Sequence, residues 1–214
     1  MNTLMPASIL IVDDHPLLRK GLVQLINDEN ELEVIAEASN GQDAIELAEE
    51  HDPDLVLLDL NMQGMDGLET LRMMRNKGVT SRIIMLTVSN NDEDVVQAVT
   101  SGADGYLLKD MMPEEIIEKL KEAIQGKMAI SEQLTSVLAD ALRQGKNSKP
   151  NPLNSLTSRE YEILKLIAKG LSNKHIAREL DISDGTVKVH VKHILKKLGL
   201  RSRVEAAVFV INNT

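Results

Sequence analysis

The sequence contains no cysteine and no tryptophan, and it has only two tyrosines and one phenylalanine among 214 residues. The absence of cysteine excludes disulfide bonds, thiol catalysis and thiolate metal sites. Aromatic side chains are also too few to stack on the bases of single-stranded nucleic acid. No apolar run reaches the roughly 18 residues of a membrane-spanning helix, and no secretory signal is visible at the N-terminus. A cytoplasmic protein fits these absences.

The net charge of −9 is unevenly distributed along the chain. Residues 153–214 contain 11 Lys and Arg against 6 Asp and Glu, a net charge of +5. Residues 1–152 contain 13 basic and 27 acidic residues, a net charge of −14. The length and this asymmetry indicate two domains, of which the basic one faces nucleic acid. Chance clustering of solvated charges is the alternative explanation.

Short apolar runs alternate with helical patterns over the first 125 residues. The apolar runs cover 9–12, 32–36, 55–58, 82–86 and 105–108. The helical patterns lie near 17–27, 41–50, 66–76, 92–101 and 114–125. Such alternation is typical of parallel βαβ units. It predicts an α/β fold, a doubly wound five-stranded parallel sheet with strand order 2-1-3-4-5, whose ligands bind beyond the carboxyl ends of the strands.

The remaining residues predict a linker and a second domain. We expect the α/β domain over residues 1–127 and a linker over 128–152, with one helix near 131–143 and a polar end. Residues 153–214 then predict an all-α four-helix domain, with helices near 158–169, 173–180, 184–197 and 202–211. Thr157 and Glu160 have the spacing of a capping box at the start of the first of these helices.

Carboxylates follow two strands that the predicted order makes neighbours. Asp13 and Asp14 follow the first strand, and Asp59 ends the third. Like charges so close together need neutralisation, which a magnesium ion bound by oxygen ligands would supply. Thr87 and Lys109, at the ends of strands four and five, add a hydroxyl and an ammonium group. Such a set suits phosphoryl transfer, with Asp59 accepting the phosphoryl group as an acyl phosphate.

A simpler interpretation is that each aspartate only caps the helix that follows it. His15 and Pro16 favour this interpretation, because proline is common at the first position of a helix. It leaves unexplained why Asp59, Thr87 and Lys109 arrive at the same edge of the sheet.

Three segments carry a resemblance to the receiver domain family over residues 8–126: Ile11-Val12-Asp13-Asp14-His15-Pro16, Leu57-Leu58-Asp59-Leu60-Asn61-Met62, and Gly102-Ala103-Asp104-Gly105-Tyr106-Leu107-Leu108-Lys109. The resemblance implies a CheY/flavodoxin-like fold with Asp59 as phosphoacceptor. It also implies that Mg²⁺ is held by Asp13, Asp14, Asp59 and the backbone carbonyl of Asn61. Thr87 and Lys109 would bind the phosphoryl oxygens, and Tyr106 would change rotamer on activation.

Two residues depart from the receiver pattern. Gln63 and Asp110 stand where many receivers have proline. The first departure leaves the stiffness of the loop beside Asp59 open, although Gly64 and Gly67 keep its turn chemistry. The second leaves open how that face communicates with the output domain.

Residues 170–187 predict a helix, a tight turn and a second helix. On the second helix a buried stripe is expected at Val187, Val191, Ile194 and Leu198, beside a basic row at Lys188, Lys192 and Lys196. An apolar face backing a row of cations suits the major groove of double-stranded DNA. Val189, between the lysines, either contacts a thymine methyl group or is an ordinary exposed valine. Thr186, at the start of the helix, is also an expected DNA contact, and phosphate contacts are expected from Lys174, Arg178, Lys197, Arg201 and Arg203.

The segments Leu156–Glu160, Thr186–Lys192 and Lys197–Arg203 resemble the LuxR/FixJ-type output domain. The whole chain therefore resembles the NarL/FixJ/LuxR family of two-component response regulators, and within it the nitrate/nitrite regulators. In that family the positions of Lys188, Val189 and Lys192 reach the bases. The resemblance implies that a sensor histidine kinase phosphorylates Asp59, that this releases the helix-turn-helix from a masking receiver, and that the chain then regulates transcription from promoter DNA.

The last helical pattern has an apolar stripe at Val204, Ala207, Val208 and Ile211. This stripe either seals the small core or pairs two copies of the chain, since helix-turn-helix dimers match palindromic sites. We expect a homodimer on DNA, and RNA polymerase is a candidate partner.

Two other functions remain to be weighed. A Mg²⁺-dependent phosphohydrolase acting through an aspartyl phosphate would need a proton-transferring group near Asp59, and Asn61 cannot transfer a proton. A LuxR-type regulator that responds to another signal by binding a small molecule would need an apolar pocket, whereas the N-terminal half offers converging acids. We therefore expect no enzymatic activity beyond slow self-dephosphorylation.

Overall fold

The computed structural model describes residues 6–88, 92–126, 129–130 and 156–213. The strands of the N-terminal half are β1 (Ala7–Val12), β2 (Leu32–Ala38), β3 (Leu55–Asp59), β4 (Arg82–Thr87), β5 (Gly105–Leu108) and β6 (Ala129–Ile130). Its helices are α1 (Pro16–Asn27), α2 (Gly41–His51), α3 (Gly67–Lys77), α4 (Asp92–Thr100) and α5 (Pro113–Ile124). The C-terminal half contains α7 (Ser158–Ala168), α8 (Asn173–Glu179), α9 (Asp184–Leu198) and α10 (Arg203–Asn213).

The sheet is parallel throughout and has the strand order β2-β1-β3-β4-β5-β6. The five predicted strands and their order are confirmed. The sixth strand was not predicted, because two residues are too few to give an apolar run. In the register of the sheet, Val12 lies opposite Leu58, so the residues that follow them leave the sheet at the same level.

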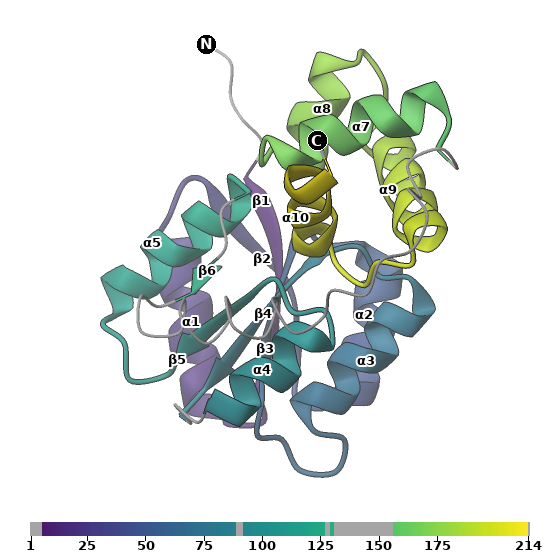
Figure 1. Cartoon of the computed structure of the whole chain (residues 1–214). Helices are drawn as coiled ribbons and strands as arrows, with labels where there is room; N and C mark the ends of the chain where they lie inside the picture. Colours follow the sequence, from purple (N-terminus) through teal and green to yellow (C-terminus); the bar gives the residue numbers. More distant parts are fainter. Residues whose placement is uncertain (1–5, 89–91, 127–128, 131–155, 214) are drawn as a thin grey trace.

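The sheet is covered on both faces, and each face has its own core (Figure 1). On one face α2, α3 and α4 bury side chains such as Ile45, Leu71 and Val95. On the other face α1 and α5 bury Ile26 and Leu120. Burial on both faces explains why the central strands read as continuous apolar runs in the sequence.

The four C-terminal helices bury a separate core that contains Ile163, Ile176, Val187 and Ala206. The predicted capping box at the start of α7 is confirmed, because Thr157 accepts from the backbone N–H of Glu160 and the Glu160 carboxylate accepts from that of Thr157. These bonds satisfy two backbone N–H groups that the helix leaves without partners.

Several predictions concern residues beyond this description. The helix expected near 131–143 lies outside the described residues, and the boundaries of the two domains stay a prediction. Within the described residues, none of the helices combines the length and the apolar character that crossing a membrane requires.

Candidate functional site

The carboxyl ends of β1, β3 and β5 bring two aspartates and a lysine into contact. Asp13 and Asp59 are fully buried. The ammonium nitrogen of Lys109 lies 2.7 Å from Asp59 Oδ2 and 2.8 Å from Asp13 Oδ2. Lys109 is fixed by its backbone, whose N–H donates to the carbonyl of Thr87 at 2.7 Å. The sequence therefore predicted correctly which side chains meet at this edge.

The interpretation of these aspartates as helix caps is wrong for α1 and α3. The N-cap of α1 is His15, which makes no capping hydrogen bond with its side chain. The cap of α3 is Asp66, which accepts from the backbone N–H of Glu69. Asp13 instead accepts from the backbone N–H of His15 at 2.7 Å. Asp59 caps neither helix and lies with Asp13 and Asp14 in a group of carboxylates that we call the acidic cluster.

His15 is a member of the acidic cluster that sequence reasoning did not identify. Its Nδ1 lies 2.8 Å from Asp14 Oδ1 and 3.3 Å from Asp13 Oδ1. The run Asp13-Asp14-His15 contained the signal, but the histidine was read only as part of a helix start. Its side chain is largely exposed, so the imidazole lies on the solvent side of the buried Asp13 and Asp59.

The electrostatics of the cluster favour an added cation. Burial raises the pKa of Asp59, the nearby charge of Asp13 adds to this, and Lys109 and the backbone N–H of Asn61 oppose it. Lys109 is the one ammonium group that contacts Asp13 and Asp59 among the described residues, so a single lysine charge faces these two carboxylates and that of Asp14. Ligand atoms of these aspartates and of His15 lie within 4.8 Å of one another. Oxygen donors at this spacing fit a hard divalent cation such as Mg²⁺.

Thr87 and Tyr106 form a hydroxyl pair behind the cluster. Both side chains are fully buried, and their hydroxyl groups are hydrogen-bonded to each other. Burial, with the charge of Asp94, raises the pKa of Tyr106 to about 12, so the phenol is neutral. Thr87 Oγ1 also accepts from the side-chain amide of Asn61 at 3.4 Å. A group bound at Asp59 that engages Thr87 would disturb this contact with Tyr106.

The departure at Gln63 has a structural role. Its backbone N–H donates to Asp14 Oδ2 at 3.1 Å and ties the loop after β3 to the acidic cluster. Proline has no N–H and could not make this bond. The loop is therefore held by a hydrogen bond where many receivers use a rigid ring.

The predicted faces of α9 are confirmed. Its buried residues are Val187, Val191, Ile194, Leu195 and Leu198, and Ser183 caps its N-terminus by accepting from the backbone N–H of Thr186. Val189 is 53% exposed, while Lys192 and Lys196 lie on the outer side of the helix. We call α9 the recognition helix.

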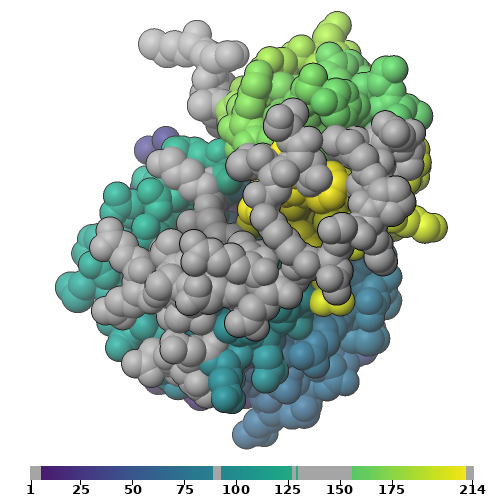
Figure 2. Space-filling view, viewed as in Figure 1, coloured from purple at the N-terminus to yellow at the C-terminus, as the bar shows by residue number. Residues whose placement is uncertain are grey.

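The recognition helix packs against the N-terminal half (Figure 1), and Figure 2 shows the green C-terminal half directly beside the teal part of the N-terminal half. Lys188 pairs with Asp52 at 2.8 Å, and Lys192 lies so close to Gly78 that a Cβ there would come within 2.5 Å of its side chain. In the same interface Lys174 pairs with Asp54 at 2.9 Å, and Arg201 donates to the carbonyl of Thr100.

This interface lies at the amino-terminal ends of the strands, and the acidic cluster lies at their carboxyl ends. Asp52 and Asp54 precede β3, and Thr100 precedes β5. Asp13 and Lys109, in contrast, follow their strands. A change at the cluster must therefore cross the length of the strands to reach the recognition helix.

The other predicted phosphate contacts fall into two groups. Arg178 is exposed on α8. The prediction for Arg203 is wrong, because this residue is 6% exposed and its guanidinium holds Asn173 and the carbonyl of Leu171 inside the C-terminal half. Lys197 pairs with the buried Glu160 at 2.6 Å, so it serves the capping box of α7. Charge counting alone cannot separate such internal cations from surface cations.

The sequence matches two known families. Residues 9–121 match the response regulator receiver domain, and residues 154–210 match the bacterial regulatory proteins of the luxR family. The chain belongs to the LuxR family of two-component response regulators. It joins a receiver domain to a helix-turn-helix DNA-binding domain, and as a response regulator it regulates transcription.

Three relatives place this response regulator more closely. It is 58% identical to the nitrate/nitrite response regulator protein NarL of Escherichia coli (strain K12) over 210 residues, which cover 98% of this chain and 97% of NarL. It is 46% identical to NarP of the same strain over 206 residues, 96% of this chain and 95% of NarP. The crystal structure of the response regulator ChrA, of a heme-sensing two-component system, matches with a TM-score of 0.53 at 31% identity and covers 98% of both chains.

Membership of this family implies the general classes of partner that the response regulator has. A receiver domain implies a sensor histidine kinase and Mg²⁺, and the acidic cluster is compatible with that ion. A luxR-type domain implies DNA. Two further relatives, LnrK and LiaR of Bacillus subtilis (strain 168), are named transcriptional regulatory proteins.

Proposed function

We propose that phosphorylation of Asp59 frees the recognition helix from the receiver and thereby switches on DNA binding. The observation that carries this proposal is the position of Lys188, a predicted DNA contact, which is paired with Asp52 of the receiver. A lysine held there cannot also reach a base in the major groove. We call this packing of the two domains the closed arrangement.

The transfer moves a phosphoryl group from a phosphohistidine of the kinase to Asp59. The P–N bond to the histidine breaks as an oxygen of the Asp59 carboxylate forms an O–P bond, which gives an acyl phosphate. Lys109, 2.7 Å from Asp59, and the hydroxyl of Thr87 neutralise and orient the transferred oxygens. Asp13, Asp14, Asp59 and the carbonyl of Asn61 would hold Mg²⁺, which would supply further positive charge.

The signal to the rest of the receiver begins at Thr87. Once its hydroxyl turns toward the phosphoryl group, the buried Tyr106 loses a hydrogen bond and adopts another rotamer. Asn61 cannot transfer a proton, so hydrolysis of the acyl phosphate at this site is slow. The lifetime of the active form is then set mainly by the kinase and by spontaneous hydrolysis.

In the released form α9 enters the major groove. Lys188, Val189 and Lys192 contact base edges, and the surrounding contacts come from Thr186, Lys196, Lys174, Arg178 and Arg201. Two copies bind inverted half-sites through α10, and RNA polymerase is the downstream partner in the cytoplasm. Because the relatives NarL and NarP are nitrate/nitrite response regulators, the controlled genes are those of nitrate- and nitrite-dependent anaerobic respiration.

Labelling with a small-molecule phosphodonor tests the chemistry. In the presence of Mg²⁺ we expect the chain to accept one phosphoryl group, and Asp59→Asn to accept none. Asp66→Asn is a matched control, since this aspartate only caps α3. Label that survives in Asp59→Asn contradicts the assignment of the acceptor.

A further inference from the structure

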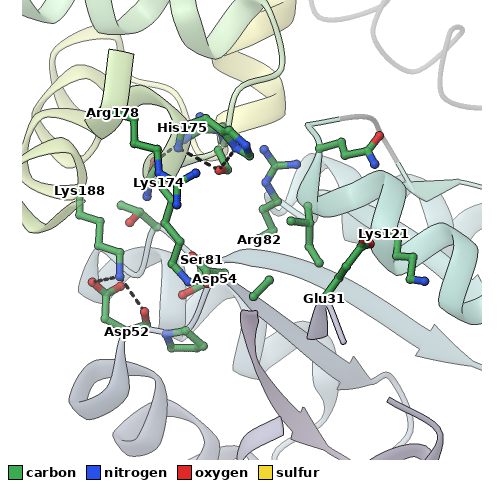
Figure 3. Close-up of a pocket in the computed structure, with 18 residues that line it drawn as sticks. Glu31, Asp52, Asp54, Ser81, Arg82, Lys121, Lys174, His175, Arg178 and Lys188 are labelled. Carbon is green, nitrogen blue, oxygen red and sulfur yellow. Dashed lines mark hydrogen bonds and ion pairs between the residues drawn. The ribbon is translucent and has the colours of Figure 1, made fainter. Parts of the chain in front are cut away.

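A pocket of about 250 Å³ lies between the two domains, at the edge of the sheet that faces α8 (Figure 3). Receiver residues before β3 and β4 form one side, and α8 with the start of α10 forms the other. Six cationic side chains but only three carboxylates line the pocket. The cations are Arg82, Lys121, Lys174, Arg178, Lys188 and Arg203.

The lysines of this set already have carboxylate partners within 2.9 Å: Lys121 with Glu29, Lys174 with Asp54 and Lys188 with Asp52. The arginines differ. Arg82, Arg178 and Arg203 form no ion pair in the part of the chain that the structure describes. The pocket therefore keeps an excess of positive charge that comes from its arginines.

Two of these arginines are buried. Arg82 is 8% exposed and Arg203 is 6% exposed. Figure 3 shows Arg82 extending from the sheet toward the C-terminal domain, and its guanidinium makes no hydrogen bond with any described residue. Nε of Arg203 is buried and likewise has no hydrogen-bond partner among the described residues. Burial, and then the charge of Arg82, lower the pKa of Arg203 to about 9. The charges of Asp104 and Asp54 favour the charged form of Arg82, and those of Asp104 and Asp184 favour that of Arg203. Among the described residues, however, neither arginine forms an ion pair with a carboxylate, and a bound anion would compensate these buried cations directly.

We propose that this pocket binds a small organic phosphate, with its phosphate group between Arg82 and Arg203. Guanidinium groups match phosphate oxygens in geometry, and two of them suit a group that carries up to two negative charges. The pocket has the volume of roughly eight liquid water molecules, which is more than a free phosphate ion fills. Ala7, Pro53 and Ile124 provide an aliphatic wall for the carbon skeleton of the ligand.

Such a ligand contacts both domains and so binds only the closed arrangement. At a ligand concentration ten times its Kd, the ratio of closed to open protein rises about elevenfold. The ligand also holds Arg178 and Lys174 on the receiver side. It therefore opposes DNA binding, and by linkage DNA opposes the ligand. This consequence rests on the proposed function, whereas the binding itself does not.

Calorimetric titration of the full, unphosphorylated chain tests the binding. The probes are ribose 5-phosphate, inorganic phosphate and uncharged ribose, at constant ionic strength in chloride. We expect saturable binding of ribose 5-phosphate with a Kd below about 1 mM, weaker binding of inorganic phosphate and none of ribose. Circular dichroism verifies that each variant is folded.

Three variants test the site. We expect Arg82→Gln to weaken binding at least about tenfold, and Arg178→Gln, at an exposed position, to weaken it severalfold. Lys20→Gln removes one charge from the exposed face of α1, away from the pocket, and should leave the Kd unchanged. Absence of saturable binding, or equal Kd values for Arg82→Gln and Lys20→Gln, overturns the proposal. Inorganic phosphate binding as tightly as ribose 5-phosphate overturns the assignment to an organic phosphate.

A second measurement separates the pocket from the switch. Ribose 5-phosphate should weaken the binding of the wild-type chain to a DNA site that was selected for binding to the phosphorylated protein. It should leave the binding of Arg82→Gln to the same site unaffected. If the ligand binds but DNA affinity does not change, the pocket stands and its link to the proposed switch is refuted. If no ligand binds, the pocket is refuted and the switch is unaffected.

Discussion

Lys188 of the recognition helix contacts both the carboxylate and the backbone carbonyl of Asp52 in the receiver, each at 2.8 Å. Burial alone would lower the pKa of Lys188, but the contact with Asp52 outweighs burial and raises it. The lysine therefore stays charged in the interface, as it must be on DNA. In the proposed switch Lys188 exchanges Asp52 for DNA, so this contact would be a point of control.

The ion pair predicts that Asp52→Asn weakens the closed arrangement. Asparagine tolerates the left-handed backbone conformation of this residue, which has φ of 44°, so the fold should be kept. Because the Asp52 side chain is 46% exposed, the loss is modest, and we expect unphosphorylated protein to bind DNA about threefold to tenfold more tightly. Fluorescence anisotropy with a labelled DNA fragment measures the change.

Glu49→Gln is the matched control for Asp52→Asn. Glu49 lies in the last turn of α2, just before Asp52, and pairs with Lys77 inside the receiver at 2.6 Å. Glu49→Gln therefore removes one negative charge, as Asp52→Asn does, without changing a residue of the interface. Equal DNA affinities for the two variants would show that the Asp52 contact does not restrain the recognition helix.

The hydrogen bond from the backbone N–H of Gln63 to Asp14 predicts that Mg²⁺ affinity depends on this N–H and not on the Gln63 side chain. Gln63→Pro removes the N–H donor and frees the Asp14 carboxylate, and we expect Mg²⁺ to bind about twofold to tenfold more weakly. Gln63→Ala keeps the N–H and should bind Mg²⁺ like the wild type. Titration with Mg²⁺ followed by calorimetry distinguishes the two variants. A similar loss in both would assign the effect to the side chain instead.

Glu160 predicts an acid-sensitive stability of the DNA-binding domain. Burial would raise its pKa, but Lys197 and the N–H of Thr157 outweigh burial and lower it to about 2. A lowered pKa means that the stabilisation is complete above about pH 4.5 and is lost as the pH falls toward 2. At neutral pH we expect Glu160→Gln to reduce the free energy of unfolding by about 1–3 kcal/mol.

Hydrogen exchange of the α7 amides, measured at pH 7 and near pH 3, tests the role of Glu160. Glu162→Gln is the control, because Glu162 forms an exposed pair with Arg159 and takes no part in the capping box. Wild-type protection in Glu160→Gln would mean that the capping box contributes nothing to stability.

Most strands of the receiver and the residues at their ends could be predicted from the sequence, because short apolar runs mark the strands locally. Apolar runs define the strands, and the parallel order brings the strand ends together, so Asp13, Asp59 and Lys109 could be grouped without a structure. His15 was missed because it was interpreted only as part of a helix start, although it directly follows Asp13 and Asp14. The effect of Gln63 could not be foreseen either, since the donor is a backbone N–H that every residue except proline possesses.

The contacts between the domains could not be predicted. They join surface charges of residues far apart in the chain, such as Asp52 and Lys188, and any surface carboxylate before a strand looks the same in the sequence. The charge pattern correctly marked the C-terminal half as the basic one. It did not reveal that Arg203 is buried or that Arg82, at the start of β4, faces the same pocket.

The affinity of the full chain for DNA, before and after phosphorylation of the same sample, tests the switch most directly. With a small-molecule phosphodonor and Mg²⁺, we expect the wild type to bind a selected DNA site at least about tenfold more tightly, because the closed arrangement is lost. Asp59→Asn should show no change under the same treatment. Equal affinities of phosphorylated and unphosphorylated wild-type protein would contradict the account.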